Sequence, residues 1–142
     1  MAKPRRVALS LACLFIALGR PAQMSACECK ELSLEDALRR ADVVFTGRVV
    51  GLGLDYERGE RIATMKVDRV FKGDVSGRLR VVTALTEAAC GFMFAREKTY
   101  VIFARAKAGR VATSLCEGNL VISPGKWPAA LGSGESPTTP SK

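Results

Sequence analysis

Hydrophobic and polar residues alternate with a period of two along five stretches of the chain, which is the pattern of a half-buried β-strand. In the second stretch the alternation slips where two bulky residues, Val70 and Phe71, follow each other, and this slip predicts a β-bulge or a barrel corner. Short strands without long helices between them predict an all-β fold, and five strands favour an antiparallel barrel of the OB type. The stretches are residues 42–50, 61–71, 79–83, 99–105 and 111–116.

A helical pattern precedes the first of these stretches. Ser33 offers an N-cap hydroxyl with an acidic residue three positions later. Leu34, Ala37 and Leu38 then share one helical face up to Arg40. We therefore expect a short helix of about two turns before the first strand.

The first 26 residues have the layout of a secretory signal peptide. Their basic start, MAKPRR, is followed by an apolar run from Val7 to Leu18, which is too short to span a bilayer because a span needs about 20 residues of helix. We expect cleavage after Ala26, so that the mature chain begins at Cys27 in the periplasm or outside the cell. A faint likeness of residues 24–27 to a bacterial lipoprotein box leaves lipid anchoring as an alternative.

The rest of the chain divides into one domain and a tail. Residues 27–122 have a length that suits a single hydrophobic core. Residues 123–142 are rich in Pro, Gly, Ser and Thr and have almost no apolar periodicity beyond Trp127 and Leu131. This composition predicts a disordered tail.

The charge of the chain argues against a nucleic-acid partner. Its formal net charge of +8 falls to +4 (18 basic minus 14 acidic residues) once residues 1–26 are removed. Basic and acidic residues are interspersed, and no aromatic residues suited to base stacking lie among them. Basic positions on the expected strands are solvent-facing charges or, alternatively, contacts for an anionic surface or glycan: Lys66, Arg69, Lys72, Arg78 and Arg80.

Catalysis is not expected from this sequence. It contains no histidine, which excludes Ser-His-Asp and Cys-His catalysis as well as histidine zinc ligands. The acidic residues form no recognisable catalytic motif. We therefore expect a protein that is not an enzyme and that carries no cofactor.

Four cysteines remain after the signal peptide, namely Cys27, Cys29, Cys90 and Cys116. An even number in an oxidising compartment predicts two disulfides. The alternative, a zinc site of four thiolates, lacks the paired CxxC spacing that such sites use. A bond between Cys27 and Cys29 is the least plausible pairing, because residues two apart in an extended segment point the same way. The N-terminal segment is therefore expected to be joined both to the Cys90 loop and to the end of the last strand.

Five short segments carry a resemblance to a known family. In their order and spacing, over about residues 27–122, they resemble the N-terminal inhibitory domain of the tissue inhibitors of metalloproteinases, which belongs to the netrin-like group of OB barrels. The segments are Cys27–Glu28–Cys29, Ala41–Asp42–Val43–Val44, Val70–Phe71–Lys72–Gly73, Glu87–Ala88–Ala89–Cys90–Gly91–Phe92 and Thr113–Ser114–Leu115–Cys116.

The resemblance implies a disulfide pairing and a mechanism. It implies Cys27 paired with Cys90 and Cys29 paired with Cys116. It further implies that the α-amino group and carbonyl oxygen of Cys27 chelate the catalytic zinc of a target protease and displace the water that the zinc would activate. The expected partner is accordingly a zinc metalloprotease, and the metal belongs to that partner alone.

The resemblance also assigns the neighbouring contacts. Glu28, where the animal inhibitors have a small hydroxyl residue, would enter the protease pocket beside the metal, and Ala88 and Ala89 would form an adjoining part of the contact ridge. The expected function is thus that of an exported, monomeric metalloendopeptidase inhibitor. The alternative is a non-inhibitory, netrin-like binding module of the cell surface or envelope.

Overall fold

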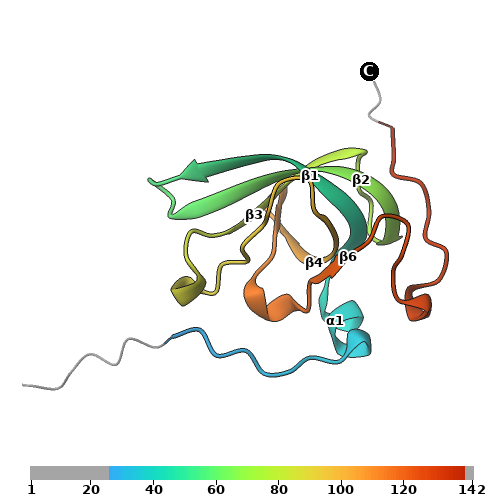
Figure 1. Cartoon of the computed structure of the whole chain (residues 1–142), viewed down its shortest axis with the longest axis horizontal. Helices are drawn as coiled ribbons and strands as arrows, with labels where there is room; N and C mark the ends of the chain where they lie inside the picture. Colours follow the sequence, from blue (N-terminus) through green and yellow to red (C-terminus); the bar gives the residue numbers. More distant parts are fainter. Residues whose placement is uncertain (1–25, 140–142) are drawn as a thin grey trace, which may run out of the picture.

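The computed structural model describes residues 26–139, whose strands form one sheet that closes on itself (Figure 1). The strands are β1 (Val43–Asp55), β2 (Glu60–Lys72), β3 (Arg78–Ala84), β4 (Thr99–Lys107), β5 (Arg110–Ala112) and β6 (Leu120–Ile122); α1 spans Leu34–Arg40, and the 3-10 turns are η1 (Glu87–Ala89), η2 (Leu115–Glu117) and η3 (Ala129–Leu131). Neighbouring strands run β1–β2–β3–β5–β4, and β4 pairs again with β1. The expected five-stranded barrel with a short helix is confirmed, while β6 adds a short strand beside β4.

Most of the expected signal peptide, residues 1–25, lies outside the described residues, as do residues 140–142 of the tail. Of that segment the structure describes only Ala26, the residue before the expected cut, and Ala26 is exposed. Among the residues that the structure describes, no helix has both the length and the apolar character that a membrane span requires.

The barrel is mixed, whereas the sequence predicted antiparallel pairing throughout. Val81 and Val82 of β3 pair with Val111 and Ala112 of β5 in parallel, and this join has only these two residue pairs. All other joins are antiparallel. The reason is geometric: in a closed ring of five strands that alternate in direction, the odd number forces one neighbouring pair to run the same way.

A β-bulge lies where the sequence predicted a slip in β2. Val44 pairs with Lys72 and Phe45 with Val70, so Phe71 is the extra residue opposite the junction. A second register shift, where Gly47 pairs with Val67 and Thr46 with Arg69, brings Val70 onto the same face as Val67. Val70 therefore joins the core inside the barrel, and its neighbour Phe71 packs in a second cluster outside it. The strand bends at this point, as bulged strands do, and the prediction of a bulge is confirmed.

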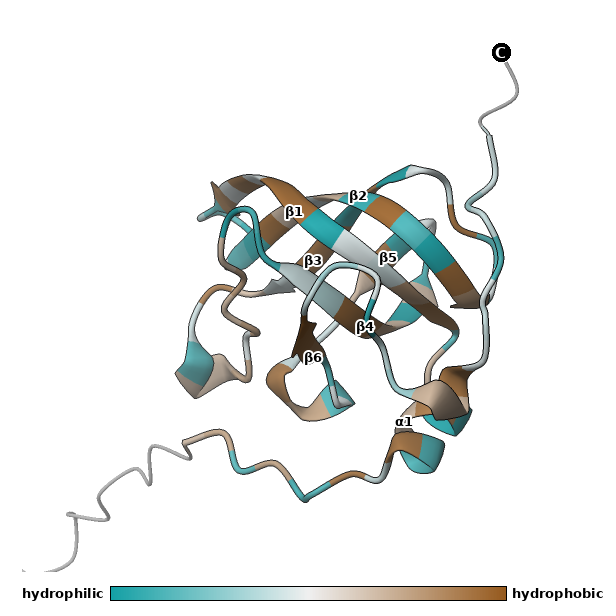
Figure 2. Cartoon of the chain, turned by 45° about the vertical axis from the view of Figure 1, so that its right-hand side comes forward, coloured by the Kyte–Doolittle hydropathy of each residue, from teal (hydrophilic) through white to brown (hydrophobic). Residues whose placement is uncertain are grey.

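The main core fills the inside of the barrel with alternate residues from each strand, an alternation that Figure 2 shows along β1 and β2. Its largest fully buried members include Phe45, Met65 and Ile102. The aromatic ring of Tyr100 packs edge-on against Phe92 and Phe94 at centroid distances of 5.6 and 5.5 Å. These rings belong to β4 and to the connection after η1, so the core anchors that connection to the barrel.

A second apolar cluster lies on the outer side of β1 and β4, where α1 covers them. Ala37 and the C-cap residue Ala41 are 2% and 1% exposed and pack with Val44, Val101 and Phe103. The helix begins as predicted, since the Ser33 side chain accepts a hydrogen bond from the Asp36 N–H. At its other end, Lys72 Nζ donates to the carbonyl oxygens of Leu38 and Arg39 at 2.9 and 3.3 Å.

The tail is ordered from residue 123 to 139, and the prediction of disorder there is wrong. Trp127 and Leu131 pack against the second cluster, and the Trp127 ring lies 5.5 Å from that of Phe71. The backbone of Glu135 exchanges two hydrogen bonds with Val70, at 2.9 and 2.7 Å. Two apolar anchors and these backbone bonds compensate for the entropy of ordering a segment whose composition is otherwise that of a flexible chain. Figure 1 shows the tail running along the barrel wall.

Replacing Trp127 with alanine is expected to release the tail and to lower the free energy of unfolding by about 2 kcal/mol, about half the cost of deleting a fully buried tryptophan. The melting temperature should fall by about 8 °C. Limited proteolysis should then cut within residues 123–139 faster than in the parent protein. Val121→Ala is a suitable control, because Val121 is 66% exposed. An unchanged rate of cleavage would contradict the anchoring role.

Candidate functional site

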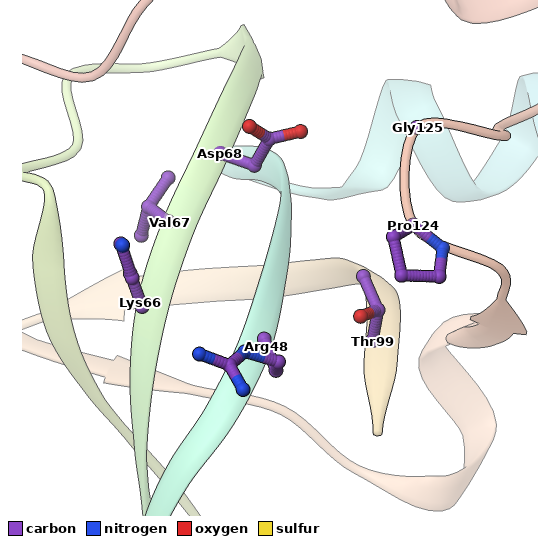
Figure 3. A pocket seen from close by; sticks show the side chains of 7 residues that line it. All are labelled: Arg48, Lys66, Val67, Asp68, Thr99, Pro124 and Gly125. Atoms are coloured by element: carbon purple, nitrogen blue, oxygen red, sulfur yellow. The ribbon is translucent and has the colours of Figure 1, made fainter. Parts of the chain in front are cut away.

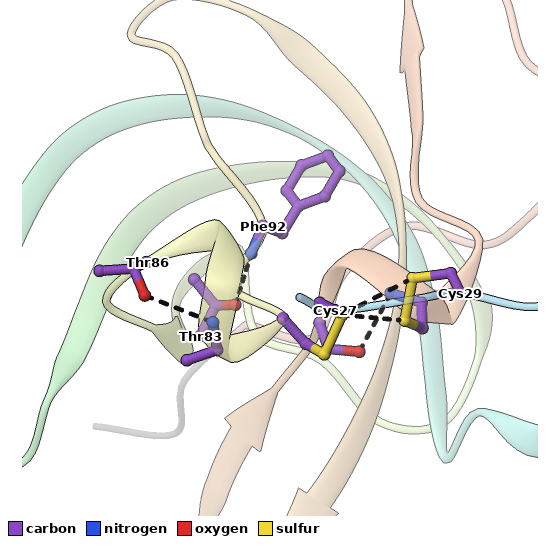
Figure 4. The surroundings of a disulfide bond; sticks show 9 residues. Cys27, Cys29, Thr83, Thr86 and Phe92 are labelled. Carbon is purple, nitrogen blue, oxygen red and sulfur yellow. Dashed lines mark hydrogen bonds between the residues drawn. A yellow bond between two sulfur atoms is a disulfide. The ribbon is translucent and has the colours of Figure 1, made fainter. Parts of the chain in front are cut away.

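Two disulfides fix residues 27–29 to the barrel (Figure 4). We call residues 27–29, Cys90 and Cys116, joined by these two bonds, the disulfide clamp. The structure pairs Cys27 with Cys90 and Cys29 with Cys116, with Cα–Cα distances of 5.1 and 5.0 Å. This is the pairing that the family resemblance implies. The two bonds are adjacent, since Cys27 Sγ lies 3.6 Å from Cys116 Sγ and 4.0 Å from Cys29 Sγ.

The compact sulfur cluster also bears on the alternative of a zinc site. The Sγ atoms of Cys27, Cys90 and Cys116 lie within 4.8 Å of one another, a spacing that suits a shared metal ion. All four sulfurs are nevertheless engaged in disulfides. A disulfide sulfur has no thiolate to offer, and thiolate is the form that binds zinc. The described geometry is therefore that of a covalent staple.

The loop that carries Cys90 is a tight turn held by threonine side chains. Thr86 caps η1, because its hydroxyl accepts a hydrogen bond from Ala89 N–H at 3.3 Å and its carbonyl accepts one from Gly91 N–H at 2.8 Å. Cys90 adopts a left-handed conformation with φ of 63°. Beyond it, Phe92 N–H donates to the hydroxyl of buried Thr83 at 2.8 Å. The bonds to the two threonine hydroxyls are drawn in Figure 4, and together with the backbone bond they fix the direction in which Cys90 meets Cys27.

The residue after Cys90 must be glycine, because the backbone at the start of the turn passes close to Gly91. A Cβ atom on Gly91 would lie 2.1 Å from the carbonyl oxygen of Ala84 and 2.8 Å from that of Thr86. Both contacts are to backbone, which cannot rotate away. Only glycine therefore fits between the end of β3 and the turn that presents Cys90.

Cys116 lies in a short excursion from the sheet and not at the end of a strand as the sequence predicted. The strand β5 ends at Ala112, and Cys116 belongs to η2. On the neighbouring strand, β5 pairs with residues 105–107 of β4 and β6 pairs with residues 99–101. Residues 113–119 thus leave the sheet between β5 and β6, which both pair with β4.

Two side chains replace the ladder hydrogen bonds that this excursion interrupts. The Asn119 side-chain oxygen accepts a bond from Phe103 N–H at 2.9 Å, and the Thr113 hydroxyl donates to the Phe103 carbonyl at 2.7 Å. The Asn119 amide nitrogen in turn donates to the Thr113 hydroxyl at 2.8 Å and to the Ser114 carbonyl at 3.1 Å. The excursion can therefore carry Cys116 away from the sheet without leaving the buried backbone of Phe103 unpaired.

The two loops of the clamp are also joined directly by a backbone hydrogen bond. Leu115 N–H donates to the carbonyl oxygen of Cys90 at 2.8 Å. The predicted contact residues Ala88 and Ala89 lie in η1 on the Cys90 loop and are exposed, as is Glu28, while Cys27 is half-buried. The structure thus places Cys27 beside the loop that bears both alanines, through the Cys27–Cys90 bond.

Sequence reasoning missed the polar residues that shape the site. Isolated Thr and Asn residues gave no pattern from which their roles could be found: Thr83, Thr86, Thr113 and Asn119. Leu115, which the resemblance included without assigning it a role, is 39% exposed next to Cys116. The Thr86-Glu87 pair ahead of small residues was the one available signal, since Thr is a favoured cap of a helical turn.

Shifted pKa values in the described residues mark capping and hairpin contacts. The Ser33 hydroxyl, followed by the Arg39 guanidinium, lowers the pKa of Asp36 at the start of α1. The Arg58 backbone N–H, with its guanidinium, lowers the pKa of Asp55 at the tip of the β1–β2 hairpin. Both carboxylates stay charged at neutral pH and support local turns.

No protein-family model matches this chain, and no curated protein matches it. What the structure establishes is a small β-barrel, closed by five strands and joined to its N-terminal segment by two disulfides. Stapled domains of this size are typical of proteins outside the reducing cytosol. The chain is therefore consistent with an extracytoplasmic module.

Proposed function

We propose that this protein is an exported inhibitor-like module that blocks a zinc metalloendopeptidase through the amine and carbonyl oxygen of Cys27. The observation that carries the proposal is the disulfide clamp, which fixes both ends of residues 27–29 to the barrel. An amine and a carbonyl oxygen on one residue form a bidentate chelate. Bound at a catalytic zinc, they occupy the position of the water that the protease must activate.

The clamp supports this role because it removes most of the freedom that binding would otherwise cost. Immobilising flexible groups at an interface costs about 0.5–1.5 kcal/mol for each rotamer-rich side chain, and pre-ordering avoids much of it. Cys27 and Cys29 are held by covalent bonds, and exposed Glu28 is presented between them. The side chains of Ala88 and Ala89 are small and exposed, so they do not obstruct a partner that approaches Cys27.

Glu28 restricts the proteases that would suit this surface. Its carboxylate would enter the substrate pocket beside the zinc, and burial of an unpaired charge is strongly unfavourable. A matching pocket must therefore offer a cation or several hydrogen-bond donors. The proposed target is a zinc protease with such a pocket, met in the compartment to which the protein is exported.

The test compares the processed protein, beginning at Cys27, with two forms whose amine is blocked. One form keeps Ala26 as an additional residue, and the other is acetylated at the Cys27 amine. Inhibition constants are measured against a panel of zinc endopeptidases. Both blocked forms should inhibit at least a hundredfold more weakly, because in each of them the Cys27 nitrogen is an amide, which cannot coordinate the metal as a free amine does. Inhibition by the processed form should also weaken as the pH falls, since a protonated amine cannot bind zinc.

A third form, Glu28→Thr, separates the chelating group from the pocket contact. It should inhibit proteases with apolar pockets more strongly than the parent protein and should still depend on a free amine. Equal inhibition by the free and blocked forms would refute chelation. So would the absence of inhibition by both the parent protein and Glu28→Thr across the whole panel.

A further inference from the structure

Three exposed basic side chains are neighbours on the outward face of β2 and β3, and we call them the cationic triad: Lys66, Arg78 and Arg80. Lys66 lies directly opposite Arg78 in the antiparallel register, and Arg80 follows two residues later on the same face of β3. Residues directly opposite have Cβ atoms about 5 Å apart, and residues two apart along a strand are separated by about 7 Å. The triad is therefore compact and lies on two paired strands of the sheet.

The charges of the triad are not balanced by ion pairs within the described part of the chain. Arg48 of β1, which lies opposite Lys66 on its other side, is paired with Glu97. Like charges placed directly opposite on neighbouring strands destabilise a sheet. The Lys66–Arg78 pair thus carries a repulsion that an anion bound over it would relieve.

Two surface pockets lie at the ends of the triad. Lys66 and Arg48 line the first, of about 580 Å³, together with Thr99 of β4. Figure 3 shows Arg48 and Lys66 next to each other, from adjacent strands, with Asp68 farther along β2. Arg80 lines the second pocket, of about 360 Å³. Because Arg78 is opposite Lys66 and two residues from Arg80, the triad connects the two pockets.

The second pocket ends in two further arginines with fixed partners. Arg58 and Arg110 line it, paired with Asp55 at 2.9 Å and with Glu60 respectively. Glu60 raises the pKa of Arg110, so this guanidinium stays charged. These pairs hold guanidinium groups at the hairpin tips, while the excess positive charge of the surface comes from the triad.

We infer that the cationic triad, with the pockets at its two ends, binds a linear anionic polysaccharide. A chain of sulfate or carboxylate groups complements a row of fixed cations that leads from one pocket to the next. Neither pocket is lined by an aromatic residue, whereas single-stranded nucleic acids are held by stacking on aromatic rings. This inference does not depend on the proposed inhibition, because none of the three residues lies in the loops that carry the clamp.

The experiment uses the whole processed protein and heparin as the probe. Lys66→Gln, Arg78→Gln and Arg80→Gln are combined in one variant. The matched control combines Arg40→Gln, Arg96→Gln and Lys107→Gln, which removes the same charge from exposed positions elsewhere. The triad variant should bind heparin at least tenfold more weakly, and the slope of log K against log salt should fall by about two to three. The control should retain most of the parent affinity.

Binding and melting measurements decide the outcome. Equal losses in the two variants would show a general charge effect and would overturn the inference, as would tighter binding of a single-stranded oligonucleotide than of heparin at equal salt. Heparin should raise the melting temperature of the parent but not of the triad variant. Unliganded, the triad variant should melt at or above the parent temperature because repulsion is removed, so weak binding cannot be attributed to unfolding. Acetylation of the Cys27 amine should leave heparin binding unchanged, which separates this test from that of inhibition.

Discussion

Replacing Cys29 and Cys116 together with serine should lower the free energy of unfolding by about 4.5 kcal/mol and the melting temperature by about 15–20 °C. The two residues are 87 positions apart, so their bond closes most of the domain into a loop. In the chain-entropy account, such a cross-link acts mainly by restricting the unfolded chain. The barrel itself should still form, because neither side chain belongs to the buried core.

Thermal unfolding followed by circular dichroism measures this loss. The companion variant, in which Cys27 and Cys90 become serine, removes a bond of separation 63 and should cost about 0.3 kcal/mol less. A loss below about 1 kcal/mol in both variants would show that the N-terminal segment adds little to stability. The clamp would then serve only to position residues 27–29.

Gly91→Ala should be the most damaging change of a single small residue, with an expected loss of about 3 kcal/mol or more. The new methyl group would lie 2.1 Å from the Ala84 carbonyl oxygen, so either the end of β3 or the η1 turn must shift. Because Cys90 precedes Gly91, the shift also moves the disulfide to Cys27. We therefore expect this variant to lose the proposed inhibitory activity along with stability.

Gly53→Ala is the matched control for Gly91→Ala. A Cβ atom at Gly53 meets nothing within 4 Å, and this exposed strand position has no positive φ. Its melting temperature should stay the same or rise by a few degrees, because alanine restricts the unfolded chain. If both variants melted at the parent temperature, the backbone around Gly91 would have to be more open than described.

Much of the barrel could be predicted because its strands each place one face in a core. Alternation located the longer strands closely, although β1 extends beyond the predicted residue 50 to Asp55. Gly51 and Gly53 explain that difference, since residues without side chains give no alternation. A bulge near the end of β2 was also readable, because the apolar alternation that runs through Val67 shifts where Val70 and Phe71 follow.

The features that sequence reasoning missed depend on contacts between distant segments. The tail was predicted to be disordered from its composition. It is ordered because Trp127 packs against the ring of Phe71, which lies on the bulged part of β2. The last strand was extended to Cys116 because residues 111–116 show a plausible alternation. Its break depends on Asn119 reaching Phe103, a hydrogen bond that no local pattern announces.

The candidate site was only partly readable for the same reason. Counting cysteines after a predicted signal peptide indicated two disulfides, and the pairing rested on the family resemblance, since geometry along the chain left two arrangements open. The loops that bring Cys90 and Cys116 to one junction are joined by the Leu115–Cys90 backbone bond. The proximity of Cys90 and Cys116 thus depends on the closed barrel and cannot be read from the order of residues along the chain.

The narrow parallel join of the barrel also bears on self-association. Only Val81 and Val82 of β3 pair with β5, so within the described residues the first half of β3 has no strand partner on that side. An unpaired strand edge is a template on which a second molecule can add a strand and begin to aggregate, and charged side chains are a common protection. Arg78 and Arg80 lie on this half of β3. Two copies that approach edge to edge therefore bring like charges together. This repulsion protects the unpaired edge of β3 from pairing with a second molecule.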